Sequence, residues 1–355
     1  MCECDRLKRF FQKHPYQHKT FFERPDVTRR RFFEILGAGV TGSYLLPRLH
    51  AADGDANSAG VTTQNKAKNV IFILLTGAIS HTDTFDLKMV NGVTPSNFNP
   101  TFVNGLNWPM GLLPKIGGLL PNLALVRSMQ AHALVHTLAQ HWTQIGRNPA
   151  AALGNIAPNI GSIVAVEKDK ERTPGQVFPT FLALNSNACV GSGYLSASYA
   201  PFKITPATTG LPNTTNADDP TGANGRFNIM YGGLRTLDDP LRTNSPYGKA
   251  LQDYDSFYQQ AKGMMYNSTV DAAFKFSSSD GQRYGSSGFG NACLVAKQVL
   301  AANQGTRFVL ISFGSWDMHQ DIYGQQNLNG NNLYTMGKQL DNGYSALVSD
   351  LKASG

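Results

Sequence analysis

Two uninterrupted apolar runs constrain the fold of this chain most strongly. They read "VIFILL" at 70–75 and "RFVLISF" at 307–313. Neither run alternates apolar with polar residues, as a strand with one face in water would. Short unalternating runs rich in β-branched residues are typical of strands that are covered on both faces, as in a parallel sheet. "NLALVRSM" at 122–129 is a further strand candidate.

Helical patterns flank the run at 307–313. "NACLVAKQVLAANQG" at 291–305 has helical spacing and ends on Gly305, a residue that favours helix C-termini. In 333–351, Leu, Met and Tyr recur at steps of three and four, which predicts an amphipathic helix. The order helix, strand, helix predicts an α/β fold, a three-layer sandwich with a mostly parallel sheet. Residues 200–245, rich in Pro, Gly, Thr and Asn, are expected to be a loop-rich insertion.

The N-terminal segment has the order of an export signal. Thr28-Arg29-Arg30-Arg31-Phe32-Phe33 resembles a twin-arginine motif, an apolar stretch follows to Leu46, and small residues surround Ala51. The alternative is an amphipathic helix with a basic end. The apolar stretch is too short and interrupted to span a bilayer. We therefore expect an extension and signal over 1–52, a linker over 53–67 and one domain over 68–355, and a periplasmic or extracellular protein.

Charge and cysteine content exclude some classes of function. The 355 residues carry a formal charge of +7, and residues 1–52, with ten basic and five acidic side chains, account for +5 of it. The remaining +2 gives the body no footprint for nucleic acid. Cys189 and Cys293 are the cysteines beyond the leader, and they could form a disulfide or remain buried free thiols.

Histidines and aspartates gather after the predicted strands. His81 lies in "SHTDTFD" at 80–86, His136 and His141 follow the run at 122–129, and His319 lies in "SWDMHQD" at 315–321. Parallel sheets bind ligands at the carboxyl ends of their strands. Mixed His and Asp sets suit zinc, manganese or iron, whereas calcium would take oxygen ligands alone. The sequence therefore predicts a divalent metal site at one edge of the sheet.

Each of these segments has a plainer interpretation. "SHTDTFD" could cap a helix, because Ser, Thr and Asp accept hydrogen bonds from free N–H groups. His132 and His136 are four residues apart, a spacing that allows two side chains on one helix face to bind a metal. This spacing more often arises by chance than from metal binding. Asp317 and His319 alternate directly after a buried strand, so on an extended segment they would point to the same side, and this is the sharper metal-site signal.

The chain resembles the bacterial "domain of unknown function 1501" family, exported proteins related to the alkaline phosphatase and sulfatase superfamily. "TRRRFFEILGAG", "LLTGAISHTDTFDLK", "HTLAQHWTQIG", "RYGSSGFGNACLVAKQVL" and "SWDMHQD" are similar to family segments and occur in the family's order. The resemblance implies an alkaline-phosphatase-like, metal-dependent hydrolase of phosphate or sulfate esters. Small molecules or polysaccharides would carry the ester, and the twin-arginine machinery would export the chain.

The resemblance also implies a set of site residues. The metal, zinc or manganese, would be held by ligands drawn from the following set: Asp83, Asp86, His136, Asp317 and His319. A superfamily nucleophile is a Ser or Thr beside the metal, which gives Ser80 and Thr84 as candidates.

Three departures qualify this assignment. The family usually has Gly-Gly-Pro before the serine, whereas this chain has Gly77-Ala78-Ile79. The superfamily often has a metal-binding Asp at the end of the first strand, where this chain has Thr76. The family continues beyond the point that corresponds to Gly355, so the domain is expected to be C-terminally incomplete, with an unpaired sheet edge near its last helix. The alternative function is an exported binding or structural protein without turnover.

Overall fold

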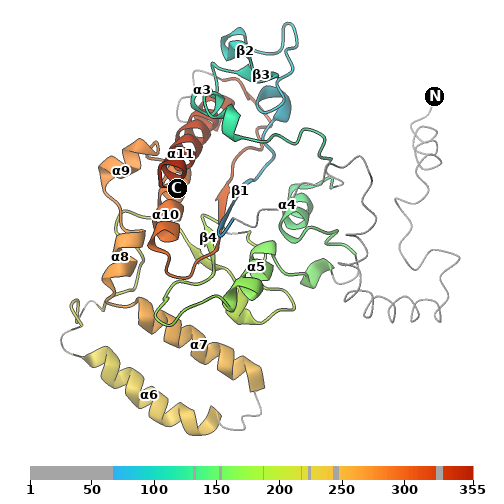
Figure 1. The fold of residues 1–355 in the computed structure, drawn as a ribbon. Coiled ribbons are helices and arrows are strands. Elements are labelled where there is room, and N and C mark those ends of the chain that lie inside the picture. Colours follow the sequence, from blue (N-terminus) through green and yellow to red (C-terminus); the bar gives the residue numbers. More distant parts are fainter. Residues whose placement is uncertain are drawn as a thin grey trace, which may run out of the picture. The chain divides into compact units, whose positions relative to one another are not determined.

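Four parallel strands form the central sheet, in the order β1 (Val70–Leu75), β6 (Phe308–Phe313), β4 (Phe181–Leu184) and β5 (Phe202–Ile204) (Figure 1). β1 pairs with β6 along its whole length, and β6 pairs with β4 on its other side. The structure is a computed structural model, and it describes residues 67–130, 133–151, 154–186, 188–216, 218–222, 225–242, 248–324 and 331–354.

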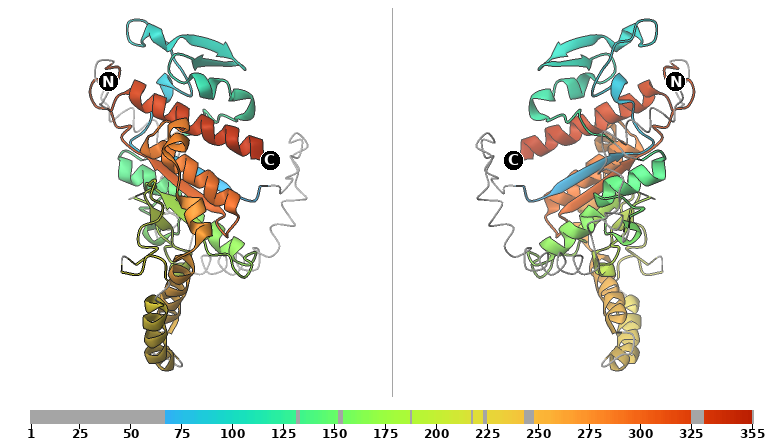
Figure 2. Two further views of the ribbon diagram at one scale, coloured as in Figure 1. Left: turned by 90° about the vertical axis from the view of Figure 1, so that its left-hand side faces the viewer. Right: turned by 90° about the vertical axis from the view of Figure 1, so that its right-hand side faces the viewer.

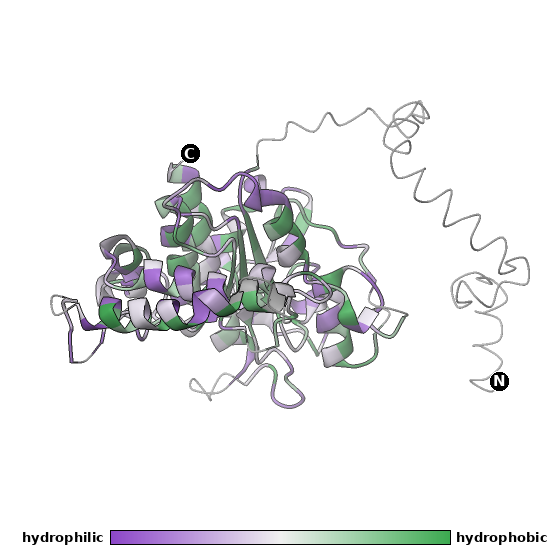
Figure 3. Cartoon of the chain, turned by 90° about the horizontal axis from the view of Figure 1, so that it is seen from below, coloured by the Kyte–Doolittle hydropathy of each residue, from purple (hydrophilic) through white to green (hydrophobic). Residues whose placement is uncertain are grey.

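Both faces of the sheet are buried, which explains the unalternating strand sequences. Along β6, Val309 and Ile311 belong to one apolar core. Phe308 and Leu310, which alternate with them, belong to another core on the opposite face. Figure 3 shows the strands coloured as hydrophobic, with mixed polar and apolar helices around them. A β-strand directs successive side chains to opposite faces, so a strand buried on both sides is apolar throughout.

Helices cover the sheet. α10 (Gly288–Ala302) contacts β6 and packs along α11 (Leu333–Ser354) in the larger core. α5 (Ile160–Asp169) contacts β4 and β6, and its Ala165 lies in the second core with Phe181. In both views of Figure 2, α11 lies between α10 and the segment that carries β2 and β3. The molecule is therefore a mixed α/β fold on a parallel sheet, as predicted from the sequence.

The remaining elements are short, apart from a pair of 17-residue helices, α6 and α7. Their bounds are β2 Pro100–Val103, β3 Leu106–Pro109, α3 Pro114–Gly117, α4 His136–Ile145, α6 Arg226–Arg242, α7 Gly248–Met264, α8 Ser268–Phe274 and α9 Ser278–Arg283, with single 3-10 turns at His81–Asp83, Ser96–Phe98, Leu120–Asn122, Gly154–Ile156 and Ala197–Tyr199. Within the described ranges, none of the helices has the length and apolarity needed to cross a membrane.

The two strongest apolar runs were interpreted correctly. β1 and β6 form the predicted strands, and α10 and α11 form the predicted helices beside them. α10 ends earlier than expected, because Asn303, not Gly305, is the residue in the left-handed conformation that caps it. The predicted leader and linker lie outside the described residues, apart from Ala67 at the end of the linker.

One sequence prediction is wrong, and another overlooked a helix. Residues 123–130 form no strand, and the strand beside β6 is β4, which was not predicted from the sequence. Val126 is 67% exposed and Met129 79%, so the segment crosses the surface, although Leu123 and Leu125 contact the core. Residues 200–245 are not all loop, since they contain β5 and α6. Gly232, Gly233 and Pro240 inside α6 hid its helical pattern.

β1 is an edge strand. Among the described residues, β6 is the one strand that is hydrogen-bonded to it. Its first residue, Val70, is 42% exposed, and the other five are half-buried. A cavity of about 400 Å³ beside it is lined by Ile71 and by Leu351 of the last helix. Within the part of the chain that the structure describes, the unpaired edge of β1 therefore lies near α11.

Candidate functional site

The loops that follow β1 and β6 are hydrogen-bonded to each other. The Thr76 N–H donates to the Phe313 carbonyl over 3.0 Å, and the Trp316 N–H donates to the Thr76 carbonyl over 3.3 Å. Gly77 has a φ of +93°, and a Cβ there would lie 2.6 Å from the backbone nitrogen of Asp317. Only glycine fits both demands, so Gly77 brings the two loops into direct contact.

A small pocket opens where these loops meet. Its volume is about 200 Å³, and its lining residues place it at the carboxyl ends of β1 and β6, beside the start of α4. The lining residues come from four segments: Gly77, Ala78 and Ser80 after β1; His136 of α4; Trp316, Asp317, Met318 and Ile322 after β6; and Leu333, the first residue of α11. Predicted residues from three of these segments therefore share one pocket: Ser80, His136 and Asp317.

Asp317 lies between two imidazoles. His319 Nε2 is 2.8 Å from Asp317 Oδ1, and His136 Nε2 is 3.1 Å from Asp317 Oδ2. The hydrogen bond with His319 holds the pKa of the Asp317 carboxyl below its usual value, and His136 lowers it further. All three side chains are solvent-accessible, with exposed fractions of 43% for Asp317, 48% for His136 and 80% for His319. A carboxylate and two imidazoles therefore meet at the pocket rim.

"SHTDTFD" forms a turn in which Ser80 contacts a buried carboxylate. The Ser80 hydroxyl donates to Asp83 Oδ2 over 2.5 Å, and the Tyr323 hydroxyl donates to Asp83 Oδ1 over 2.8 Å. Asp83 is 7% exposed. Burial, together with its bond to Asp83, raises the pKa of Tyr323 to about 12, so the phenol keeps its proton at neutral pH. Both oxygens of Asp83 are thus occupied by hydroxyl donors.

The helix-cap interpretation of this segment does not hold for Ser80. Residues His81–Asp83 form a single 3-10 turn, and the Ser80 side chain makes no capping hydrogen bond to it. Thr84 is fully buried, and its hydroxyl donates to the Ser80 carbonyl over 2.7 Å. Thr84 does not line the pocket, whereas Ser80 does. The turn therefore presents the Ser80 hydroxyl at the pocket wall and uses Thr84 as a support.

Asp86 is directed elsewhere. Its Oδ1 atom lies 2.9 Å from Arg127 and 3.0 Å from Lys88. Its hydrogen bond to Lys88, followed by that to Arg127, lowers the pKa of the Asp86 carboxyl. Asp86 is not a lining residue of the pocket. Of the two aspartates in the predicted ligand set, Asp83 is the one joined to the pocket, through Ser80.

A buried polar network holds the far end of α4. Gln144 Oε1 accepts from the Asn159 side chain over 3.0 Å and from the Val190 N–H over 2.9 Å. Asn159 caps α5 by accepting from the Gly161 N–H, and both amide side chains are almost fully buried. Satisfied buried networks fix the elements they join. This network ties α4, whose first residue is His136, to α5 and to the segment after β4. His132, the other half of the proposed histidine pair, lies outside the described residues, and residues 133–135 are not helical.

The donor chemistry of the rim fits a divalent ion, although its present arrangement does not. Two imidazoles and a carboxylate are ligands that zinc and manganese take. Among the described residues, however, no group of three or more His, Cys, Asp or Glu side chains is placed so that it could hold a metal ion. The two histidines contact different oxygens of Asp317. Metal binding would have to replace these direct contacts.

The backbone at the pocket is strained at two positions. Ala78 has a φ of +64° and Ser315 a φ of +73°, in the left-handed region that residues other than glycine seldom adopt. Ala78 lines the pocket directly, and Ser315 precedes Trp316, which lines it too. Such strain costs on the order of 1–2 kcal/mol per residue and is concentrated at functional sites.

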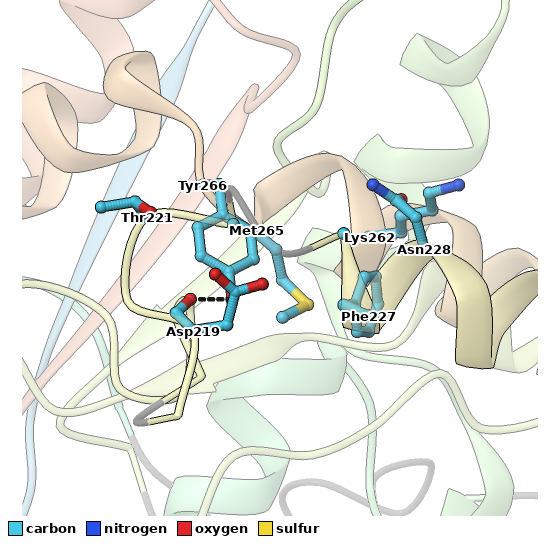
Figure 4. Close-up of a pocket in the computed structure, with 9 residues that line it drawn as sticks. Asp219, Thr221, Phe227, Asn228, Lys262, Met265 and Tyr266 are labelled. Carbon is cyan, nitrogen blue, oxygen red and sulfur yellow. Dashed lines mark hydrogen bonds between the residues drawn. The ribbon is translucent and has the colours of Figure 1, made fainter.

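A second pocket lies away from these residues. Its volume is about 200 Å³, and Asp219, Lys262 and Tyr266 are among its lining residues (Figure 4). The Tyr266 hydroxyl donates to the Asp219 carbonyl over 2.7 Å. None of the predicted site residues lines this pocket. The pocket at the sheet edge is the stronger candidate, because it combines a hydroxyl, an imidazole and a carboxylate.

Comparison with known families tests the family resemblance that the order of the motifs suggested. One family's sequence model, described as "Protein of unknown function (DUF1501)", matches residues 67–355. The chain belongs to the DUF1501 family. No curated protein and no solved structure matches the chain. Ala78, which stands where the resemblance implied the second glycine of a Gly-Gly-Pro segment, adopts a conformation that suits glycine.

Sequence reasoning missed three residues, two at the candidate site and one beside it. Tyr323 bonds to Asp83 from 240 residues away, and Arg127 reaches Asp86 across 41 residues. Neither residue belongs to a motif with recognised spacing, so the sequence carried no signal for them. Gly77 was read only as part of a family segment, although a glycine directly after a buried strand is a recognisable signal for close backbone approach.

Proposed function

We propose that this DUF1501 protein is an exported hydrolase of phosphate or sulfate esters that acts with a divalent metal ion, zinc or manganese. The reaction would take place in the pocket at the carboxyl ends of β1 and β6. The proposal rests on one observation above all. A serine hydroxyl bonded to a buried carboxylate lines the same pocket as an aspartate that two histidines contact.

Ser80 is the proposed nucleophile and Asp83 its proton acceptor. Their 2.5 Å contact places the hydroxyl proton on a line toward the carboxylate. Attack would form a bond between Ser80 Oγ and the phosphorus or sulfur and would break the bond to the leaving alcohol, which takes up a proton. Water would then release the phosphate or sulfate from Ser80. Tyr323 holds the second oxygen of Asp83 and so fixes the direction of the first.

His136, Asp317 and His319 are the proposed metal ligands. A bound divalent ion would supply charge stabilisation to the ester's oxygens and lower the pKa of a coordinated hydroxyl or water. Without it, the three side chains already lie in contact at the rim. Asp83 is left out of this ligand set because hydroxyl donors occupy both of its oxygens, and Asp86 is left out because Arg127 and Lys88 pair with it.

The alkaline-phosphatase-like, three-layer architecture and the export route belong to the same proposal. α10 and α5 contact the central strands, which is the arrangement such a sandwich requires. Export rests on Arg29, Arg30 and the apolar stretch after them, all outside the described residues. Cell fractionation tests it, since a chain with both arginines replaced by lysine should remain in the cytoplasm.

The hydrolase proposal is tested with the Ser80→Ala variant. The full chain, supplied with Zn²⁺ or Mn²⁺, should hydrolyse p-nitrophenyl phosphate or p-nitrophenyl sulfate. Loss of the nucleophile should lower kcat by at least about a hundredfold. Ser279→Ala, in an exposed serine of α9, is the matched control and should keep full activity. Unchanged kcat in Ser80→Ala would remove Ser80 from the mechanism.

A non-catalytic binding protein is the second candidate. It is favoured by the arrangement of the rim, where the histidines contact Asp317 directly and no metal-ready group occurs in the described part of the chain. This candidate predicts that neither ester is turned over with either metal, while the fold remains intact by circular dichroism.

A further inference from the structure

α6 and α7 form an antiparallel hairpin away from the central sheet (Figures 1 and 2). Side chains join the two helices along one side of α6. Arg235 of α6 is ion-paired with Asp255 of α7, and the Lys262 ammonium lies 4.6 Å from the centre of the Tyr231 ring. These contacts define the side of α6 that faces α7.

A different side of α6 carries an apolar stripe at heptad spacing. The stripe consists of four residues at successive steps of four, three and four: Met230, Leu234, Leu237 and Leu241. They are exposed by 63%, 38%, 73% and 70%, respectively. At 3.6 residues per turn the stripe lies roughly a quarter of a turn from the side that faces α7. Steps of three and four that repeat every seven residues are the pattern by which one helix packs against another.

α7 continues this apolar surface. Tyr254, Phe257 and Tyr258 are exposed by 51%, 41% and 40%, and the two tyrosine rings are 4.8 Å apart. Helical geometry, taken from the contacts of Asp255 and Lys262 with α6, turns these aromatic residues to the same side of the hairpin as the stripe. We call these seven residues the hairpin face.

The size of the hairpin face is more than a monomer usually exposes. With a fully exposed large side chain at about 200 Å², its seven residues present roughly 700 Å², whereas the largest apolar patch on a typical monomer is about 300–600 Å². Two such faces pressed together would bury roughly 1,400 Å², which lies within the range of about 1,200–2,000 Å² for specific interfaces.

We propose that the hairpin face is a dimer interface, on which a second copy of this chain packs its own hairpin to form a four-helix bundle. The stripe favours a helical partner, because its spacing presents knobs to the grooves of another helix. A second copy supplies such a helix with the same spacing and with an apolar face of equal area. Two-fold symmetry is the commonest way in which a surface of this kind is covered. The proposal is independent of the hydrolase chemistry.

The test is the molar mass of the full chain in solution, measured by light scattering during size exclusion at about 50 µM, a concentration well above a micromolar Kd. The wild-type chain should have the mass of a dimer. Leu237→Lys, in the centre of the stripe, should weaken dimerisation by at least about a hundredfold and give a monomer. The matched control is Ile229→Lys, because Ile229 is 74% exposed on the same helix but about a third of a turn from the stripe.

Three outcomes overturn the proposal. A wild-type chain that is monomeric at this concentration has no such interface. A dimer that persists in Leu237→Lys uses another surface. An equal loss of dimer in Ile229→Lys shows a non-specific effect of charge on α6. A monomeric chain that floats with phosphatidylcholine vesicles, and fails to do so in Leu237→Lys, would assign the hairpin face to a lipid surface instead. Circular dichroism of each variant confirms that α6 and α7 are still helical.

Discussion

At the scale of single residues, the site depends on backbone conformations that few side chains tolerate. Gly77 allows the loops after β1 and β6 to touch, and Ala78 beside it adopts a left-handed φ of +64°. The first position could be recognised from the sequence as a glycine after a buried strand. The second could not, because alanine gives no sign of a positive φ.

Ala78→Gly should stabilise the protein by about 0.5–1 kcal/mol, since glycine adopts the left-handed conformation without steric cost. The free energy gained by removing this strain is larger than the free energy lost through glycine's greater entropy in the unfolded chain. The measurement is the urea midpoint of unfolding. Ala346→Gly, within α11, is the control with the opposite sign and should destabilise by about 1 kcal/mol. A loss of stability in Ala78→Gly as large as in the control would mean that Ala78 is not strained.

At the scale of elements, the order of strands and helices was easier to predict than the route by which His136 reaches the pocket. The histidine was expected at the end of a strand over 122–129, whereas it begins α4 after an exposed segment. β4 was missed because its four residues, "FLAL", are too few to show a period. The position of β4 beside β6 therefore could not be predicted from so short a strand sequence.

α9 and α11 are joined by a carboxylate whose charge depends on pH. Asp350 of α11 forms an ion pair with Arg283 of α9 and accepts from the Tyr284 hydroxyl over 2.7 Å. The hydrogen bond from Arg283 is the main cause that lowers the pKa of the Asp350 carboxyl. The hydrogen bond from Tyr284 lowers the pKa of Asp350 further. Since the folded pKa lies below the unfolded value of about 3.9, the stabilisation is complete above that value and is lost as the pH falls through the folded pKa.

Asp350→Asn should therefore lower the free energy of unfolding at pH 7 by about 1–2 kcal/mol, the lower part of the range for charged hydrogen bonds, because Arg283 is 57% exposed. The difference from wild type should shrink as the pH falls below about 4. Thermal melts of wild type and variant at pH 7 and below about pH 4 measure this difference in stability. Asp218→Asn is the control, since Asp218 is 78% exposed and pairs with Arg226 only at 3.9 Å. A deficit in Asp350→Asn that is equal at both pH values would contradict the electrostatic account.

At the scale of the whole molecule, residues from three distant parts of the sequence meet at one pocket. The rule that parallel strands deliver ligands to their carboxyl ends predicted that the segments "SHTDTFD" and "SWDMHQD" would be neighbours, and both contribute to the pocket. The sequence could not predict that Asp86 would be neutralised by Arg127, or that Asp83 would be held by Tyr323, because both contacts depend on loops without a motif. The exposed apolar hairpin face was also unexpected, since α6 lies in a segment predicted to be loop.

We propose that His136, Asp317 and His319 hold a divalent ion, and equilibrium dialysis against Zn²⁺ with elemental analysis measures whether they do. The wild-type chain should bind about one zinc ion per chain. Asp317→Ala should lose zinc binding, because the carboxylate contacts both histidines. His81→Ala, in an exposed histidine outside the pocket, should bind as the wild type does. Equal zinc content in wild type and Asp317→Ala, or none in the wild type, would contradict the claim.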